Sequence, residues 1–461
     1  MTMGLLMCAD PLRPGRVDPH FAAEAAALRE LGGAPALIDH DALLAGRVAE
    51  AVSRVPEGFG PAWYRGWMVG VERYRELESA LAARGCRLAT EAPAYRTAHE
   101  LPGWLATLGG LTPRSAVVPM SPGEPAPDAN RLRRLTGGLR PGAYVVKDYV
   151  KSRKHEWAQA CYAPDLAALE RVTARFLDLQ GEDLTGGLVI REYERLRGPQ
   201  LRIWWLDGEP FYTGPHPDEP HEPDESAEPG KPGEPVEPGD PIGPGVPIEP
   251  VEPVEPGDPI GPPRKLAAIR SRVRALRARF VTTDLMRRHD GAWRVVEVGD
   301  GQVSDWPRHA DPAILMRALR TAGYGLQIHK GFSGPDAWDS ATDIGASFDG
   351  VTLTGQRFDE VVTAYAIAVD LLVKAAGVTR LALRDPYGEC VAAPAARVPE
   401  LVRALMTEDR WYRLDDGAGF TVTPFDLVLH VTTPVPPGET AERIRALGLE
   451  AWDEPPLRHD D

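Results

Sequence analysis

Two acidic residues, Asp284 and Glu297, flank a turn signal and are spaced so that they can meet across a β-hairpin. Asp290-Gly291 is a strong two-residue turn signal between the β-prone runs 280–285 and 293–298. If these two residues form the turn, Asp284 lies directly opposite Glu297, with Cβ atoms roughly 5 Å apart. Two like charges at that separation repel each other, so we expect a compensating charge beside them.

A third acidic residue, Asp300, follows the second of these strands, where Gly299 and Gly301 let the backbone turn back toward the pair. Mg²⁺ favours carboxylate oxygens in combination with substrate phosphates. The three acids therefore predict a Mg²⁺ site. The alternative is a solvated hairpin whose acids are neutralised by nearby arginines, which are Arg287, Arg288 and Arg294.

Residues suited to a nucleotide precede this hairpin. Lys147 ends an apolar strand and opens a dense basic loop, whose ammonium groups can neutralise phosphate oxygens. Glu192-Tyr193 ends another apolar strand with a carboxylate and a ring, which suit the edge and the face of an adenine. Arg202 lies in a strand among large apolar residues, where an arginine usually has an anionic partner. With the hairpin, these residues are the inventory for holding a nucleoside triphosphate with Mg²⁺.

The order of predicted elements divides the chain into three domains, as expected for 461 residues of which 43% are hydrophobic. A strand at 4–9, a helix capped by Asp18-Pro19 and a strand at 36–38 predict an α/β domain with a parallel sheet at the N-terminus. An α+β domain with an antiparallel sheet and a small α+β accessory domain follow. The bounds of the three domains are 1–118, 119–325 and 351–461, with a linker at 326–350.

A proline-rich insert, residues 216–263, interrupts the second domain. A proline falls at every third position from Pro217 to Pro262, broken only at Ser226, and this period matches the polyproline II helix. Thirteen acidic residues against one lysine give the insert a net charge of −12, which leaves only −3 of the total −15 for the rest. We expect a disordered acidic spacer, or a ligand for a proline-binding domain, and no general attraction to nucleic acid or anionic membranes.

The four cysteines are far apart and form no CxxC pair, which is typical of reduced thiols in a cytoplasmic protein. The first residues lack the basic start and the long apolar run of a signal peptide. No stretch reaches the apolar length of a membrane span. We therefore expect a cytoplasmic location.

Taken in order, the motifs VVKDYVKSRKH (145–155) and FVTTDLM…GAWRVVEVGDGQVSDWP (280–307) resemble the ATP-grasp superfamily, most closely family three of its clade named for one arginine and two lysines. The resemblance covers 143–306 apart from the insert. The segments YRGWM and LPGWL also resemble those that precede this clade's nucleotide domain. The implied architecture is an ATP-grasp fold, with two α+β subdomains gripping ATP, after an N-terminal α/β (pre-ATP-grasp) domain.

The resemblance also implies roles for individual residues. Two lysines would bind the phosphates, Glu192 and the backbone near Tyr193 would bind the adenine, and Arg202 would steady the transferred phosphoryl group. The lysines are Lys147 and Lys151, with Lys154 as an alternative, and the Mg²⁺ ligands are Asp284, Glu297 and Asp300. Two features depart from the family pattern: the loop after Lys147 is nearly glycine-free, and the last metal pair is Glu-x-x-Asp in place of Glu-x-Asn.

We predict an ATP- and Mg²⁺-dependent ligase that activates a carboxylate as an acyl phosphate for attack by an amine. Positioning and charge neutralisation suffice for such chemistry, in agreement with the lack of an evident nucleophilic triad in the sequence. Two alternatives stay open: a kinase that stops at phosphoryl transfer, and a nucleotide-binding scaffold without turnover. The predicted partners are small-molecule or peptide carboxylates and amines, with neither nucleic acid nor membrane indicated.

Overall fold

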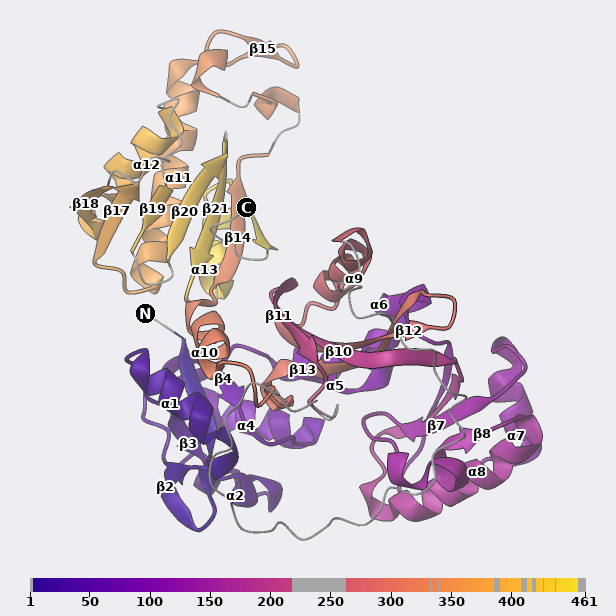
Figure 1. Cartoon of the computed structure of the whole chain (residues 1–461). Helices are drawn as coiled ribbons and strands as arrows, with labels where there is room; N and C mark the ends of the chain where they lie inside the picture. Colours follow the sequence, from indigo (N-terminus) through magenta and orange to yellow (C-terminus); the bar gives the residue numbers. More distant parts are fainter. Residues whose placement is uncertain are drawn as a thin grey trace, which may run out of the picture. The chain divides into compact units, whose positions relative to one another are not determined.

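The computed structural model describes residues 3–217, 263–331, 334–338, 340–384, 390–407, 413–416, 420–425, 427–435 and 437–454. These residues divide into two compact units (Figure 1). Unit 1 comprises residues 1–67, 76–89 and 311–461, and unit 2 comprises 68–75 and 90–310. The predicted proline-rich insert lies outside the described residues between 218 and 262.

The N-terminal part of unit 1 contains a mainly parallel sheet. The strands β3 (Ala36–Ile38) and β4 (Gly60–Arg65) flank β1 (Gly4–Asp10) in parallel, and the predicted strand–helix–strand order is confirmed. Asp18 caps the turn that precedes α1 (Ala22–Glu30). The remaining elements here are β2 (Arg13–Val17), β5 (Cys86–Leu88), α2 (His40–Leu44) and α3 (Val48–Ala51), together with the part of α4 (Val71–Ala83) that starts at Glu76.

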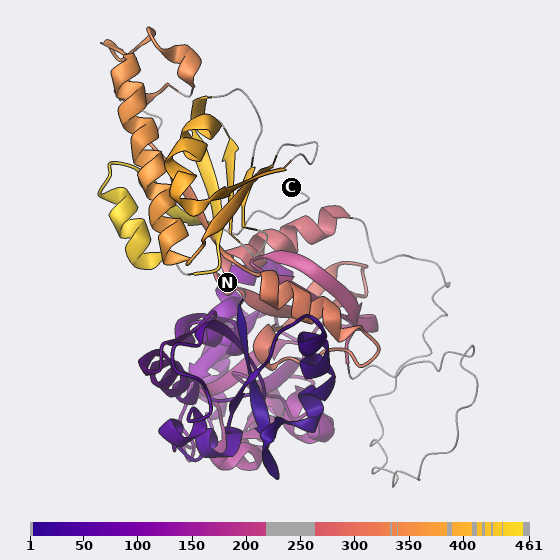
Figure 2. The ribbon, with the colours of Figure 1, turned by 90° about the vertical axis from the view of Figure 1, so that its left-hand side faces the viewer.

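The C-terminal part of unit 1 is a seven-stranded sheet in the order β18-β17-β19-β20-β21-β14-β22, with every neighbouring pair antiparallel. The long helix α11 (Gly355–Ala375) runs along one face of this sheet and shares a buried core with it (Figure 2). The other helices are α10 (Pro312–Thr321), α12 (Val398–Thr407) and α13 (Gly438–Arg445). The strands are β14 (Tyr324–His329), β17 (Arg380–Arg384), β18 (Cys390–Pro394), β19 (Arg413–Asp415), β20 (Thr421–Phe425), β21 (Val428–Thr433) and β22 (Glu450–Glu454), with the short pair β15 (Ser347–Phe348) and β16 (Val351–Thr352) beside them.

The strand pairing and the grouping into units differ from the predicted domain bounds at three places. Strand β14 pairs with both β21 and β22, so its last four residues, assigned to the linker, belong to the C-terminal sheet. Leu326 and Ile328 alternate with more polar residues and are fully buried in the core of that sheet, a two-residue period that was not assigned to a strand. In addition, residues 90–118, predicted in the N-terminal domain, group with unit 2, and residues 311–325, predicted in the second domain, group with unit 1.

Unit 2 contains two four-stranded antiparallel sheets, as predicted for an α+β domain. The first sheet has the order β6-β9-β7-β8. One of its faces packs against α8 (Leu166–Gln180), whose N-terminus is capped by Asp165. The bounds of the strands are β6 Ser115–Pro119, β7 Tyr144–Asp148, β8 Tyr162–Ala163 and β9 Gly187–Glu192, and α7 spans Ala129–Leu135.

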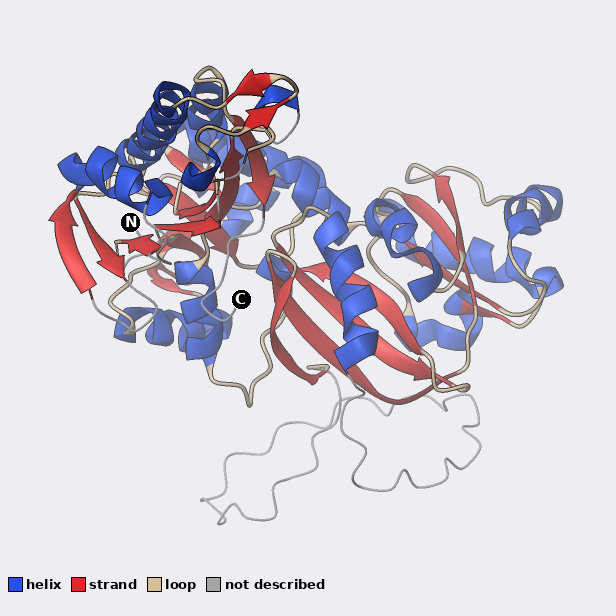
Figure 3. Cartoon of the chain, turned by 90° about the horizontal axis from the view of Figure 1, so that it is seen from above, coloured by secondary structure: helices blue, strands red, loops and turns tan. Residues whose placement is uncertain are grey.

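The second sheet of unit 2 has the order β11-β10-β12-β13. Its core face is covered by helices, and α9 lies across it (Figure 3). Trp205, Val281 and Val298 from the strands share this core with Trp104 and Val273 from the helices. The bounds are β10 Leu196–Leu206, β11 Glu209–Pro215, β12 Phe280–Arg288, β13 Trp293–Asp300, α5 Ala92–His99, α6 Leu101–Leu108 and α9 Pro263–Ala275.

Candidate functional site

The β12–β13 hairpin turns through three residues, not the predicted two. Arg288 pairs with Ala292 through an N–H···O bond of 2.8 Å, and the Gly291 amide donates to the Arg288 carbonyl at 2.8 Å. Gly291 has a φ of 82°, the left-handed conformation that closes such a loop. As a result the pairs next to the turn, Arg287 with Trp293 and Leu285 with Val295, are one residue away from the predicted register.

A β-bulge then restores the predicted register where the acids lie. Between Leu285 and Asp284 the pairing shifts by one residue, so that Val296 is an additional residue in β13. Beyond the bulge Asp284 faces Glu297, as predicted, although through a different turn. The two carboxylates therefore lie on the same face of the sheet.

Arg202 on β10 is paired with Asp284 on β12 and binds it with two hydrogen bonds. Its Nε donates to Oδ1 at 2.7 Å and its Nη2 donates to Oδ2 at 2.9 Å. Burial by itself would raise the pKa of Asp284, which is only 2% exposed, but the hydrogen bonds and the charge of Arg202 outweigh this effect and lower the pKa well below its usual value. Asp284 is therefore held as a carboxylate by a bidentate arginine.

His216 is the third member of this cluster. Its Nε2 lies 2.7 Å from Arg202 Nη2 and 3.4 Å from Asp284 Oδ2, and its side chain is buried. Because a guanidinium has only donors, the shorter contact makes Nε2 the acceptor. The sequence places His216 at the start of the predicted insert, whereas in the structure it follows β11 directly and its backbone amide donates to the Gln200 carbonyl at 2.8 Å.

Glu297 and Asp305 add negative potential around Arg202. Burial lowers the pKa of the Arg202 guanidinium, but the hydrogen bonds and charge of Asp284, followed by the charges of Glu297 and Asp305, raise it above its usual value. Asp305 follows β13 and is exposed, and no motif in the sequence pointed to it. Arg202 is thus surrounded by anionic groups.

Asp300 does not lie with the other two acids. It pairs with Val281, and strand alternation places it on the face of Val298, which is the helix-covered face. Its Oδ1 accepts hydrogen bonds from the backbone (2.9 Å) and the side-chain amide (3.1 Å) of Gln302. Asp300 thus caps the turn that follows β13, and the three-acid cluster predicted from the sequence is reduced to the pair Asp284 and Glu297.

The described residues nevertheless fit a Mg²⁺ ion bound with a nucleotide. Within them no group of three or more His, Cys, Asp and Glu side chains is arranged to hold a metal ion by itself. Mg²⁺ commonly takes only one or two protein carboxylates and completes its shell with phosphate oxygens and waters. Two facing carboxylates, one of them held ionised, meet this requirement.

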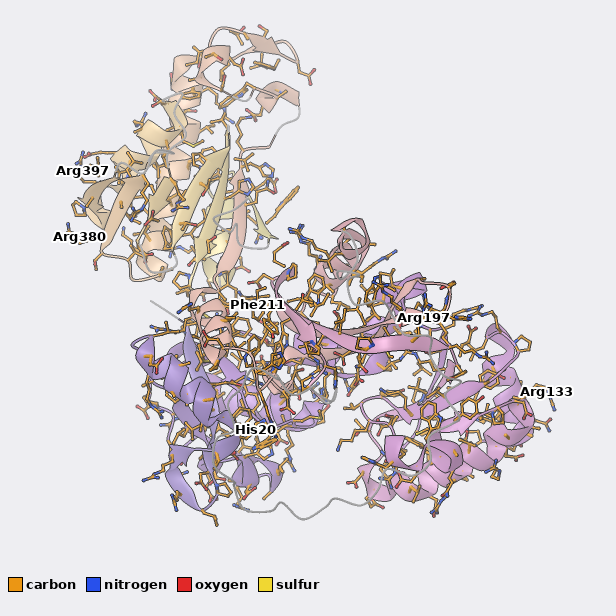
Figure 4. The ribbon with its side chains drawn as sticks, viewed as in Figure 1. His20, Arg133, Arg197, Phe211, Arg380 and Arg397 are labelled. Atoms are coloured by element: carbon orange, nitrogen blue, oxygen red, sulfur yellow. The ribbon has the colours of Figure 1, made fainter. Side chains whose placement is uncertain are left out.

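An aromatic cluster adjoins Arg202 on the same sheet. Trp204, two residues further along β10, lies with its ring centroid 5.0 Å from that of Trp306. Tyr212 on β11 lies 4.7 Å from the same Trp306 ring. Figure 4 shows Phe211 and Arg197 near opposite ends of this sheet, with Phe211 at the aromatic end. The charged pair is therefore bordered by a rigid, apolar wall.

The predicted phosphate-binding lysines follow one another along β7 and the loop after it. Lys147 is buried on the face of β7 away from α8, because its neighbours Tyr144 and Val146 pack in the α8 core. Lys151 is exposed in the loop, and the side chain of Lys154 lies outside the described residues. The phosphate contacts of all three lysines stay predictions.

Asp148 fixes the start of this basic loop. It is fully buried, and its Oδ1 accepts from the backbone amides of Val150 (2.7 Å) and Lys151. Its Oδ2 accepts from the Gln180 side-chain amide at 2.8 Å. Sequence analysis missed this role, since an aspartate directly after a lysine in a basic loop gives no sign that its side chain points inward.

The predicted adenine contacts compete with contacts inside the protein. Glu192 is 4% exposed, and its carboxylate accepts from the backbone amide (2.7 Å) and Nε (2.8 Å) of Arg140. The Tyr193 amide donates to the Ala143 carbonyl at 2.9 Å, and the Tyr193 ring is 37% exposed. A cavity of about 440 Å³ adjoins them, lined by Arg140, Pro141, Gly142, Ala143, Glu192, Tyr193, Glu194, Arg288 and Asp290.

A buried histidine beside the basic loop makes stability depend on pH. His99 stacks on Tyr95, with centroids 4.8 Å apart, and burial followed by the charge of Lys151 lowers its pKa from 6.5 to about 4. Because the unfolded chain takes up a proton that the folded chain excludes, the free energy of unfolding should fall by about 3 kcal/mol as the pH drops from about 6.5 to 4. Urea titrations of wild type and His99→Leu across this range test it: the free energy of unfolding of wild type, relative to that of His99→Leu, should fall by about 3 kcal/mol toward acid pH. A constant difference would contradict the assignment.

Comparison with known proteins agrees with this topology. Residues 136–237 and 248–319 match the family model of an ATP-grasp domain, family 3 of the clade named for one arginine and two lysines. The two matched segments contain Arg202, Asp284, Glu297 and the three candidate lysines, which are Lys147, Lys151 and Lys154. No curated protein matches the chain in sequence. In the described residues no helix has the length and hydrophobicity that a membrane span needs.

Several solved structures are similar over about two thirds of this chain. A RimK-domain ATP-grasp protein from Sphaerobacter thermophilus is 12% identical, with 69% of this chain and 99% of that chain covered and a TM-score of 0.42. The ATP-grasp ligase PsnB, complexed with a minimal precursor, Mg and ADP, is 14% identical (68% and 96% covered, TM-score 0.38). D-alanine–D-alanine ligase from Bacillus anthracis, complexed with ATP, is 15% identical (69% and 94% covered, TM-score 0.38).

The domain match agrees with the mixed α/β and α+β architecture of the described residues. Apart from β6, the strands of both antiparallel sheets lie within the matched segments, one sheet with a lysine near the end of a strand and the other with facing carboxylates. Over residues 136–237 and 248–319 the chain therefore matches an ATP-grasp domain of family 3 of the arginine-and-two-lysines clade.

Proposed function

We propose that this protein is an ATP- and Mg²⁺-dependent ligase that joins a carboxylate to an amine. The observation that carries the proposal is the pair Asp284 and Glu297, which face each other on one side of an ATP-grasp sheet, with Arg202 bound to Asp284 through two hydrogen bonds. Charge neutralisation around a transferring phosphoryl group is the main catalytic requirement of such a reaction.

In the proposed reaction the substrate carboxylate oxygen attacks the γ-phosphorus of ATP, and the bond to the β,γ-bridging oxygen breaks to release ADP. An amine then attacks the acyl phosphate, the carbon–oxygen bond to phosphate breaks, and the amine proton leaves to solvent. Arg202 would stabilise negative charge on the transferred group, and Lys147 and Lys151 would bind the other phosphate oxygens. Mg²⁺, held by Asp284 and Glu297, would neutralise charge on the phosphates.

Turnover of ATP with pooled amino acids and peptides tests this proposal. A ligase should release ADP and phosphate only when both a carboxylate and an amine are present. A kinase would release ADP without an amine and leave a stable phosphorylated product. AMP and pyrophosphate would contradict the mechanism, and nucleotide binding with no turnover for any pool would favour the scaffold.

A further inference from the structure

The bulge at Val296 determines which face of the sheet Glu297 occupies. Next to the turn, Leu285 pairs with Val295. Continued without a bulge, this register would place Val296 opposite Asp284, and Glu297 opposite Thr283 on the helix-covered face. Since successive residues of a strand point to opposite faces, the single additional residue is what brings the two carboxylates together.

The two carbonyl groups at the bulge are held from outside the hairpin. Arg191 Nη1 donates to the Val296 carbonyl at 2.7 Å, and Thr112 Oγ1 donates to the Val295 carbonyl at 2.8 Å. Arg191 Nη2 also donates to Thr112 Oγ1, so the three groups form one continuous chain of hydrogen bonds. This chain satisfies carbonyl oxygens at a position where a bulge disrupts the regular strand ladder.

Arg191 is an unusual residue to find in this position. It comes from β9, in the other sheet of unit 2, and is only 7% exposed, with its guanidinium 5.7 Å from the centre of the Trp104 ring. Burial lowers its pKa to about 10, against the opposing effect of the charges of Glu297 and Glu194. A buried arginine costs free energy, and its bonds here go to the bulge and to the residue that supports it.

We propose that Arg191 and Thr112 are positioning residues, which hold the bulge and thereby keep Glu297 beside Asp284 for a metal-bound nucleotide. The proposal rests on the proposed function, because it assumes that the two carboxylates hold Mg²⁺ with ATP. It adds two residues that contact neither the metal nor the substrate but determine the geometry of a metal ligand. Groups of this kind typically change metal affinity by about 10- to 100-fold when they are removed.

The test measures the gain in affinity that Mg²⁺ gives to a non-hydrolysable ATP analogue, adenylyl imidodiphosphate, by calorimetry with and without the metal. Arg191→Met should reduce this gain by about tenfold or more and leave metal-free binding within about twofold. Thr112→Val, which replaces the hydroxyl with a methyl group, should reduce the Mg²⁺-dependent gain by a smaller factor. Thr112→Ser, which keeps the hydroxyl, should leave the gain close to that of wild type. A loss of both metal-free and metal-dependent binding in step would overturn the proposal.

Deletion of Val296 provides a rescue experiment. Without this residue the register set by the turn continues unbroken and still places Asp284 opposite Glu297, with no bulge carbonyl left to hold. The deletion should therefore restore most of the Mg²⁺-dependent gain in Arg191→Met. If the variant that combines Arg191→Met with the deletion shows the same small Mg²⁺-dependent gain as Arg191→Met alone, the proposed role of the bulge is wrong.

A matched control removes an arginine–carboxylate pair at the end of the hairpin's own sheet, where Asp207 follows β10 and Arg279 precedes β12. Arg279 binds Asp207 with distances of 2.7 and 3.1 Å, in a part of the sheet that does not touch the bulge. The double variant Asp207→Asn, Arg279→Met should lose stability but keep the full Mg²⁺-dependent gain. If Arg191→Met does not fold, Thr112→Val decides the question. Wild type without any Mg²⁺-dependent gain would instead contradict the proposed function itself.

Discussion

Replacing Arg202 with methionine is expected to lower ATP turnover by about 10²- to 10³-fold, the usual cost of removing one group that stabilises transition-state charge. Methionine fills much the same volume but carries no charge and donates no hydrogen bond. The turnover of Arg202→Lys should lie between those of wild type and Arg202→Met, because an ammonium keeps the charge but cannot bind Asp284 through two parallel hydrogen bonds. Steady-state assays with saturating ATP, once a substrate is known, measure this directly.

Loss of turnover in Arg202→Met must be separated from loss of folding. Removing one partner of a buried ion pair costs about 3–5 kcal/mol, because the other charge is left without compensation. Asp284→Asn in the same chain should restore stability, measured by urea unfolding, without restoring turnover. Arg202→Met with wild-type turnover would remove Arg202 from the reaction.

Glu297→Gln is expected to have the second largest effect, lowering turnover by about 10²-fold or more and raising the Mg²⁺ concentration needed for half-maximal rate. Glutamine keeps the size and a carbonyl oxygen but removes the charge that faces Asp284. The variant should fold normally, since loss of one of two facing like charges relieves repulsion. Mg²⁺ titrations of the rate provide the measurement.

Asp300→Asn is the control for this prediction, because it decides between the pair and the cluster of three acids. Asp300 lies on the helix-covered face, and its Oδ1 accepts hydrogen bonds from Gln302. The Asp300→Asn variant should therefore lose stability but keep the Mg²⁺ dependence of the wild-type rate. If Asp300→Asn needs the same increased Mg²⁺ concentration as Glu297→Gln, Asp300 is a metal ligand and the cluster of three acids is correct.

Several features of the fold follow from local sequence alone. Asp165 and Asp18 cap the turns and helices that they precede, and the strand pattern around Arg202 gave the antiparallel sheet. These features depend on neighbouring residues, so that a short window contains the necessary information. The anionic partner expected for Arg202 was also found, in Asp284.

Other features depended on distant residues. The Asp290-Gly291 signal specified a turn but not its length, and the bulge that corrects the register is held by Arg191 and Thr112 from elsewhere in unit 2. The inward orientation of Asp148 likewise depends on Gln180, thirty-two positions later. No local pattern contains these partners.

The sequence by itself determined the kinds of chemical group that this protein assembles: two lysines after a strand, an arginine within a strand, and acids on either side of a turn. The tertiary structure decided which of those groups meet. Strand alternation alone puts Asp300 and Glu297 on opposite faces, because they are three residues apart in one strand. The additional residue at the bulge decides that Glu297, and not Asp300, shares the face of Asp284, and that register is fixed by residues outside the hairpin.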